Sequence, residues 1–434
     1  MKHAIQHADV TGKANHRLHG WHGWRTDGGS LHATGDRSRI VARLAVFFIR
    51  AIRVICGPSL SAASLSVLLA PALLARDFVT ANDQARFIAG LPLPARSPLA
   101  PYTKDPAWAA HSAEMDAAWI KTEQRLTKTR AWAGSYAHGG SAPCFYMFSG
   151  PDILYAQTIF PGASTYVLCG TEPVGAVPDI TQMPAGNVAP SLAVMRRSLS
   201  NVLRLSYFIT KDMRADLTGT HLGGVLPIFY FFLARTGCDV ASVDYVSLGS
   251  GGTLGKGGVS GVRIVFRSGF GSHTLYYFNA DLSNGASGGA VMNFCRHLGS
   301  GSGLLKAASY LLHEDSFSQC RNFLLTNCHT IVQDDSGIPL RYFGGRWQPR
   351  FFGHYTGTTG GIFAKYEQPD LAAAYAKVQP AELDFTLSYQ WNPKTANILV
   401  ATQTAAPKAA PAPVAKKTNA PAAPAKKHRR KTSS

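Results

Sequence analysis

The chain has 434 residues, of which 46% are hydrophobic and 16% charged, which is typical of a globular protein and excludes a chain that is disordered throughout. Its formal charge is +18, but residues 1–53 carry +6 and residues 405–434 carry +8, which leaves +4 for residues 54–404. A nucleic-acid-binding domain carries its own basic face, so this distribution argues against specific nucleic-acid binding by the folded part.

Residues 1–39 form a polar extension that contains six of the fifteen histidines. A His-rich tract can capture metal, but no cysteine or acidic residue recurs here at a ligand spacing. Secretory signals rarely start about 40 residues into a chain. We therefore interpret residues 1–39 as the product of a misassigned start and expect translation to begin near Val41.

Residues 40–75 have the order of an export signal. Three arginines between residues 43 and 53 precede a stretch, residues 54–75, that has no charged residue and ends in small residues. The stretch is also about long enough to cross a bilayer, so an uncleaved inner-membrane anchor with its N-terminus inside is the alternative. Either interpretation predicts an exported chain, in the periplasm or the extracellular space.

Residues 76–404 are long enough for one large domain, and the pattern predicts an α/β or α+β fold. Residues 106–133 have apolar side chains at helical spacing, which predicts a helix with its tryptophans in the core. Next comes the clearest signal: a strand at 144–148, a turn at 149–152, a short helix at 153–159 and a strand at 165–169. This spacing predicts a parallel βαβ unit that begins a mixed sheet with helices on its faces.

Both strands of this unit end at the same edge of the sheet, where open α/β sheets bind ligands. We therefore expect Ser149, Asp152, Thr171 and Glu172 to converge there, with Ser149 as a substrate-binding candidate and the two carboxylates as catalytic candidates. The structural alternative makes Ser149 or Gly150 a helix cap and places Glu172 in an ordinary turn.

Two helices at 191–209 and 225–235 follow, with Lys211 between them as a candidate for binding an anion. Strands are predicted at 241–248, 261–266 and 273–279. The glycine-rich loop 249–261 fits neither the phosphate-loop nor the dinucleotide pattern, so we interpret it as a connector. The sequence around Ser287 satisfies G-x-S-x-G, but residues 281–284 intervene between it and the preceding strand, which argues against a nucleophile elbow.

Helices are predicted at 304–312 and 317–331, followed by a polar turn. His313 with Asp334 and Asp335 is a candidate acid/base site, because a histidine beside a carboxylate is the usual arrangement for moving protons. A divalent cation held by the two aspartates and His313 or Glu314 is equally compatible with the sequence.

The plain alternative for this region is a capped helix, with Asp315 or Ser316 as the cap, and a surface turn at 334–337. Arg321 and Arg341 join Lys211 as candidates to complement a bound anion. The aromatic-rich C-terminal part is expected to close the domain with a strand at 384–391.

The last 30 residues, 405–434, contain ten Ala, five Pro and eight Lys or Arg, which predicts a disordered basic tail. Such a tail attracts polyanions, and for an exported chain we expect an anionic envelope polymer. Removal of Cys56 with the signal would leave six cysteines, for which bridges and free thiols both remain open.

Two functions remain open at this stage. The first is a hydrolase with a carboxylate/histidine site, and the second is a non-catalytic envelope-binding protein that adheres through its tail. The enzyme gains support if the four candidate carboxylates lie in one pocket with His313.

Overall fold

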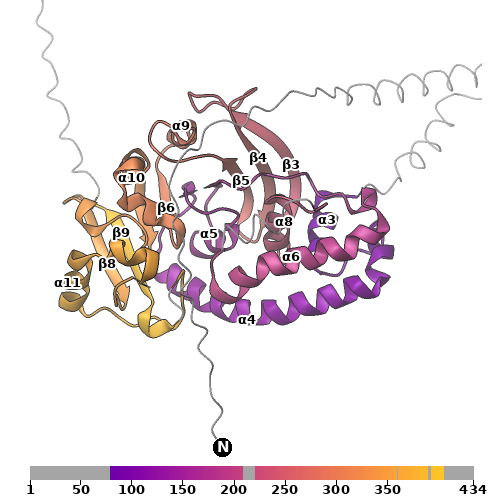
Figure 1. The fold of residues 1–434 in the computed structure, drawn as a ribbon, viewed down its shortest axis with the longest axis horizontal. Coiled ribbons are helices and arrows are strands. Elements are labelled where there is room, and N and C mark those ends of the chain that lie inside the picture. The colour runs from indigo at the N-terminus through magenta and orange to yellow at the C-terminus, as the bar shows by residue number, and fades with distance from the viewer. Residues whose placement is uncertain (1–78, 209–219, 359, 390–391, 405–434) are drawn as a thin grey trace, which may run out of the picture. The chain divides into compact units, whose positions relative to one another are not determined.

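The computed structural model describes residues 79–208, 220–358, 360–389 and 392–404. In these residues a nine-stranded mixed sheet lies between two layers of helices (Figure 1). The α/β prediction is therefore confirmed.

The helices are α3 (Ala81–Ile88), α4 (Pro106–Tyr136), α5 (Ile153–Ile159), α6 (Ala185–Leu205), α8 (Leu226–Arg235), α9 (Gly288–Leu298), α10 (Ser318–Asn327) and α11 (Pro369–Val378). The strands are β1 (Cys144–Tyr146), β2 (Thr165–Gly170), β3 (Asp239–Leu248), β4 (Val259–Ser268), β5 (Gly271–Asn279), β6 (Gly301–Leu305), β7 (Cys328–Gln333), β8 (Trp347–Gly353) and β9 (Asn397–Gln403). A 3₁₀ helix, Ala308–His313, follows β6.

The strand order is β3-β4-β5-β2-β1-β6-β7-β9-β8. Strands β5, β2, β1, β6 and β7 are parallel, whereas β4 is antiparallel to β5 and to β3, and β9 is antiparallel to β7 and β8. The chain passes from β1 to β2 and then to β5 on one side, and returns to β6 on the other side of β1. This reversal is the place where doubly wound sheets bind ligands, at the carboxyl ends of the strands.

The predicted βαβ unit is confirmed, and α5 has the bounds expected from the sequence. Each face of the sheet carries its own apolar core. The first lies under α3, α4, α5, α6 and α8, and the second under α9, α10 and α11. Strands β1 and β2 have buried side chains on both faces because helices cover both, as the continuous apolar run 144–148 indicates.

Three predicted elements are wrong in whole or in part. The predicted helix at 304–312 is strand β6 followed by a 3₁₀ helix, and the predicted helix at 317–331 is α10 followed by strand β7. A short apolar run fits a buried strand as well as a helix. Residues 384–389 form no strand, and β8 and β9 close the sheet instead.

The glycines of β6 explain why this strand was hard to predict. A Cβ at Gly301 would lie 2.6 Å from the ring of Phe145, and one at Gly303 would lie 3.2 Å from the side chain of Ile331. Bulky neighbours from β1 and β7 thus fill the space in which β6 has no side chains, so its strand character depends on tertiary packing.

Six cysteines in the described residues are buried free thiols: Cys144, Cys169, Cys238, Cys295, Cys320 and Cys328. No helix in the described ranges is long and apolar enough to span a membrane. The predictions for residues 1–39, 40–75 and 405–434, and for Cys56 and Lys211, concern parts of the chain outside the described residues.

Candidate functional site

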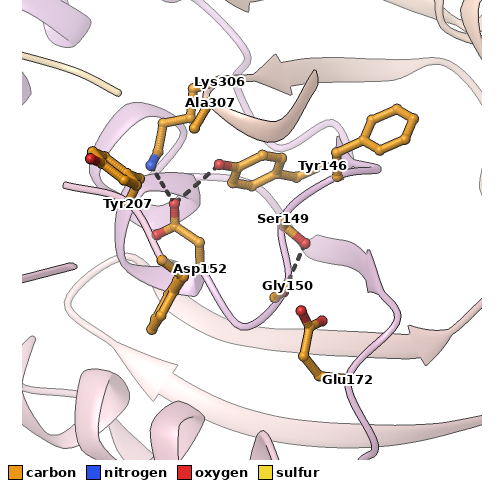
Figure 2. A pocket seen from close by; sticks show the side chains of 10 residues that line it. Tyr146, Ser149, Gly150, Asp152, Glu172, Tyr207, Lys306 and Ala307 are labelled. Atoms are coloured by element: carbon orange, nitrogen blue, oxygen red, sulfur yellow. Dashed lines mark hydrogen bonds and ion pairs between the residues drawn. The ribbon is translucent and has the colours of Figure 1, made fainter. Parts of the chain in front are cut away.

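A small cavity of about 30 Å³ lies where β1, β2 and β6 end (Figure 2). Its walls come from the loop after β1, the loop after β2, the segment after α6 and the residues after β6. The lining residues are Tyr146, Phe148, Ser149, Gly150, Asp152, Glu172, Tyr207, Phe208, Lys306 and Ala307. The cavity therefore lies at the reversal of strand order and contains three of the four residues expected at the βαβ edge, Ser149, Asp152 and Glu172.

Ser149 fixes the β1 loop to the end of β2. Its hydroxyl accepts a hydrogen bond from the Cys169 amide at 3.1 Å and lies 2.9 Å from the Gly150 carbonyl, to which it donates. The expected cap role of Ser149 is wrong, because α5 begins at Ile153 and the Asp152 carboxylate accepts from the Tyr155 amide at 3.2 Å. Gly150 has a positive φ of 53°, which is not helical, and the cap is Asp152.

Glu172 is buried, with 3% exposure, and its carboxylate faces the β1 loop (Figure 2). Tyr277 on β5 donates to its backbone carbonyl at 2.8 Å and to its carboxylate at 3.3 Å. A Cβ at Gly170 would overlap the Glu172 carboxylate and lie 2.9 Å from the Gly150 Cα. Two glycines therefore allow the carboxylate and the two loops to approach closely. Glu172 does lie in a bend after β2, as the alternative expected, but its side chain is buried.

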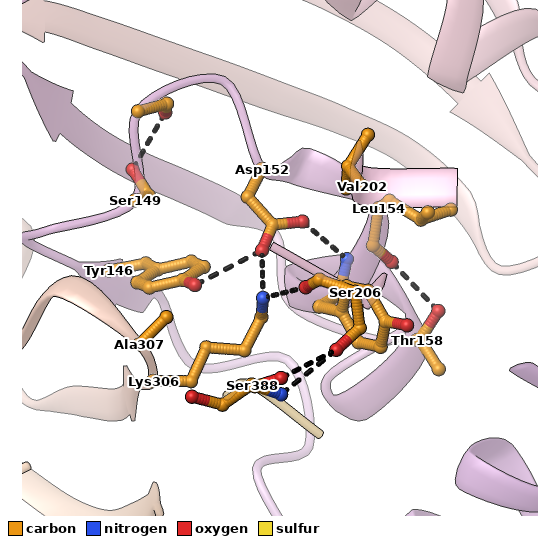
Figure 3. A network of polar contacts seen from close by, with 12 residues as sticks. Tyr146, Ser149, Asp152, Leu154, Thr158, Val202, Ser206, Lys306, Ala307 and Ser388 are labelled. Carbon is orange, nitrogen blue, oxygen red and sulfur yellow. Dashed lines mark hydrogen bonds and ion pairs between the residues drawn. The ribbon is translucent and has the colours of Figure 1, made fainter. Parts of the chain in front are cut away.

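Lys306 and Asp152 form an ion pair of 2.8 Å, and each side chain is at most 2% exposed. Tyr146 also donates to the same Asp152 oxygen at 3.1 Å, while the Lys306 ammonium donates to the Ser206 carbonyl at 2.5 Å and lies over the Tyr155 ring (Figure 3). Burial and the neighbouring Asp152 charge raise the pKa of Tyr146 well above its usual value. This tyrosine is consequently a hydrogen-bond donor at neutral pH.

Asp334 and Asp335 are buried behind the β6 loop, so the expected surface turn is wrong. Asp334 accepts hydrogen bonds from the amides of Ala307 at 3.1 Å and Ser336 at 2.9 Å. Asp335 accepts from Tyr310 at 2.5 Å and Asn397 at 3.0 Å. Burial, with the neighbouring Asp334 charge second, raises the pKa of Asp335 to about 6.

His313 lies outside the cavity lining, against the rings of Tyr310 and Tyr366 at 5.5 and 5.2 Å. Burial lowers its pKa to about 4, so the ring is neutral at neutral pH. Its Nε2 atom is buried without a hydrogen-bond partner among the described residues. The structure therefore brings Asp152 and Glu172 into one cavity, but it does not bring His313, Asp334 and Asp335 into that cavity.

The arginines that were candidates to bind an anion do not line the cavity. Arg321 is buried, donates to the Leu312 carbonyl at 2.7 Å and lies 3.9 Å from the Tyr342 ring centre, so it supports the fold. Arg341 is exposed, and neither arginine lines the cavity. Thr171 is also exposed.

The expected cation cluster is not assembled in the described part of the chain, where no group of three His, Cys, Asp or Glu is placed to hold a metal. The expected caps of α10 are also wrong. The Gln319 amide at the start of this helix donates to the Asn284 side chain at 3.0 Å, and not to Asp315 or Ser316. Ser287 precedes α9 and is exposed, and its hydroxyl accepts from the Asp281 amide at 3.0 Å.

Sequence reasoning missed Lys306, Tyr146 and Tyr207 in the cavity wall. Lys306 carried a usable signal, because it is the only charged residue between Arg296 and Glu314 apart from histidines and stands in an apolar stretch. A buried lysine needs an anionic partner. Tyr207 carried no such signal, since its place depends on how α6 ends.

Comparison with family models, curated proteins and solved structures finds no match, so no family assignment follows from similarity. The geometry of the cavity is therefore the basis for a functional proposal.

Proposed function

We propose that the protein binds a nucleoside without a phosphate group at the carboxyl edge of β1, β2 and β6. The observation that carries the proposal is the Glu172 carboxylate, which lies two residues after the end of β2 and faces the glycine-containing loop after β1. In doubly wound sheets an acidic residue at this position accepts the hydroxyl groups of a ribose. The glycines allow the ligand and the backbone to approach each other at this point.

The size of the cavity fits the diol of a ribose. A water needs roughly 10–15 Å³ of such space, so a cavity of about 30 Å³ holds about two water-sized groups. The two vicinal hydroxyls of a ribose replace two such groups, and both can donate to one carboxylate, which has about four acceptor positions. The base and the 5′ substituent would then extend along the strand ends, outside this small cavity.

The charges of the site favour a neutral or cationic nucleoside. The lining contains two carboxylates and one ammonium, and that ammonium is bound to Asp152. Asp152 also caps the N-terminus of α5, so the Tyr155 amide there already has a carboxylate acceptor. A phosphate placed here would meet carboxylates at short range and gain no free cation, which is electrostatically unfavourable.

The sheet topology makes the class of nucleoside more specific. Seven adjacent strands, β5-β2-β1-β6-β7-β9-β8, are parallel except for β9, which lies between β7 and β8. The same arrangement occurs in methyltransferases that use S-adenosylmethionine, a nucleoside that has a sulfonium cation and no phosphate. The likeness is one of strand order and supports a fold-level analogy only. It extends our proposal to a methyl donor of this class.

Calorimetric titration of the full chain tests the proposal with S-adenosylmethionine, S-adenosylhomocysteine, adenosine, 2′-deoxyadenosine and AMP. We expect adenosine to bind at least tenfold more tightly than 2′-deoxyadenosine, because the latter lacks one hydroxyl, and more tightly than AMP, because of its charge. The Glu172→Gln variant should lose at least tenfold in affinity. Glu382→Gln is the matched control, since the Glu382 side chain is 86% exposed.

Binding of AMP as tight as that of adenosine, or an unchanged affinity in Glu172→Gln, would contradict the proposal. Two predictions made from the sequence do not depend on this nucleoside site. Export through residues 40–75 and adhesion of residues 405–434 to an anionic polymer depend on other parts of the chain. A hydrolase remains a prediction, although His313, Asp334 and Asp335 lie outside the cavity that Asp152 and Glu172 line.

A further inference from the structure

Several residues near the ammonium of Lys306 have a positive backbone φ, which is unusual for residues other than glycine. Four residues other than glycine in the described ranges have a positive φ, and three of them surround this lysine: Ser206 (71°), Ala307 (59°) and Ser388 (72°). Side chains with a Cβ rarely adopt this region, because it costs free energy. Such conformations persist only where the surrounding contacts impose them, and they concentrate at functional sites.

Each of the three residues takes part in one network (Figure 3). The Ser206 carbonyl accepts from the Lys306 ammonium, and the Ser206 hydroxyl accepts from the Ser388 amide at 2.9 Å. Ala307 follows Lys306, and its amide donates to Asp334 at 3.1 Å. The network thus holds the end of α6, the residue after β6 and the Ser388 segment against one another.

Lys306 also joins two opposite walls of the cavity. Its bond to Asp152 holds the β1 loop, which contributes Ser149 and Gly150. Its bond to the Ser206 carbonyl holds the chain directly before Tyr207 and Phe208, the aromatic residues of the facing wall. One ammonium therefore sets the separation between the loop that faces Glu172 and the aromatic wall.

Stability alone does not account for this arrangement. A buried ion pair is expensive to desolvate, and well-packed neutral side chains of similar size often stabilise a fold as well or better. The backbone conformations around it add a further cost. The arrangement is explained if the spacing of the cavity walls serves the ligand.

We propose that Lys306 is a positioning residue for the nucleoside site, which fixes the β1 loop and the Tyr207–Phe208 wall at the separation that admits a ribose. This inference rests on the nucleoside binding proposed above. Lys306 acts through Asp152 and Ser206, to which its ammonium is bonded.

The test compares wild type with Lys306→Met, Asp152→Asn and the double variant, all in the full chain. Lys306→Met alone leaves a buried carboxylate without its cation and is expected to be unstable. The double variant removes both charges, and its asparagine oxygen can still accept from the Tyr155 amide at the start of α5. We expect it to melt close to wild type but to bind adenosine at least tenfold more weakly.

Hydrogen exchange provides the second measurement, and it needs no ligand. In the double variant we expect at least tenfold faster exchange at the amides of residues 149–152 and 206–208, with unchanged exchange in the distant hairpin β3–β4. Lys128→Met is the control, because the Lys128–Asp384 ion pair is exposed.

The outcomes separate the two proposals. If wild type binds no nucleoside, the proposed function fails, while the exchange data still decide whether Lys306 positions the walls. If wild type binds adenosine and the folded double variant binds it equally well, with unchanged exchange at both walls, the positioning role is overturned and the pair is only structural.

Discussion

Replacement of Gly170 by alanine tests the close approach that places Glu172 in the cavity. A methyl group at this position would overlap the Glu172 carboxylate and lie 2.9 Å both from the Gly150 Cα and from the Tyr277 hydroxyl. Ordinary contacts between such atoms are about 3.5 Å or longer, so the carboxylate and the β1 loop must each move away from the new methyl group, by up to roughly 1 Å. Overpacking of this kind costs about 1–3 kcal/mol of unfolding free energy.

The effect on ligand binding should be of a size similar to the effect on the fold. A hydrogen bond to a charged group contributes about 1.5–3 kcal/mol, and about 1.4 kcal/mol corresponds to a tenfold change in affinity. Loss of one ribose hydroxyl bond in Gly170→Ala should therefore weaken adenosine binding at least tenfold. Urea unfolding and calorimetric titration measure the two effects separately.

Gly134→Ala is the matched control for this substitution. Gly134 lies in α4, and a Cβ there meets nothing within 4 Å. Alanine should leave binding unchanged and stabilise the helix by roughly 0.5–1 kcal/mol. Our reasoning is refuted if Gly170→Ala matches Gly134→Ala in both stability and affinity, because the close approach would then have no physical consequence.

Three further predictions concern buried groups. Folding raises the pKa of Asp335 from its usual 3.8 to about 6, so the protonated carboxyl stabilises the fold below pH 4 and this contribution is lost as the pH rises through 6. The unfolding free energy of Asp335→Asn relative to that of wild type should therefore increase by on the order of 3 kcal/mol between pH 4 and 7. A difference that does not change with pH would contradict the raised pKa. Arg321→Met should cost about 1–3 kcal/mol, because the Leu312 and Glu314 carbonyls lose a buried donor; a melting temperature equal to that of wild type would show that Arg321 is dispensable. Burial raises the pKa of the Cys169 and Cys328 thiols, so peptide mapping should find both unlabelled by a thiol reagent until urea unfolds the chain; rapid labelling of the native chain would disprove their burial.

The βαβ unit could be predicted because its information is local. Residues 144–169 contain two apolar runs, a turn with glycine and proline, and a helical segment of suitable length, and each signal supports the same fold. The same spacing placed Ser149, Asp152 and Glu172 at one edge of the sheet, since parallel strands end on the same side. This part of the candidate site followed from topology without any knowledge of side-chain contacts.

The rest of the site depends on contacts between distant segments. Asp334 and Asp335 have the composition of a surface turn, but Asn397 on β9 and Gln368 before α11 supply hydrogen bonds that allow residues 334–335 to be buried. The sequence pattern predicts a helix at 304–312, which gives Lys306 no special role, although a lone lysine in an apolar run is itself a sign of a buried ion pair. The backbone conformation of Ser206 and Ser388 has no counterpart in the sequence pattern.

The two edge strands of the sheet, β3 and β8, are irregular, and this affects how the protein can associate with itself. Strand β3 has a register irregularity between Val240 and Ser242, and strand β8 contains Pro349. A bulge twists an edge out of register, and a proline has no N–H for a neighbouring strand to accept. A second copy of the chain therefore meets an interrupted ladder at either margin, which disfavours edge-to-edge aggregation at high concentration.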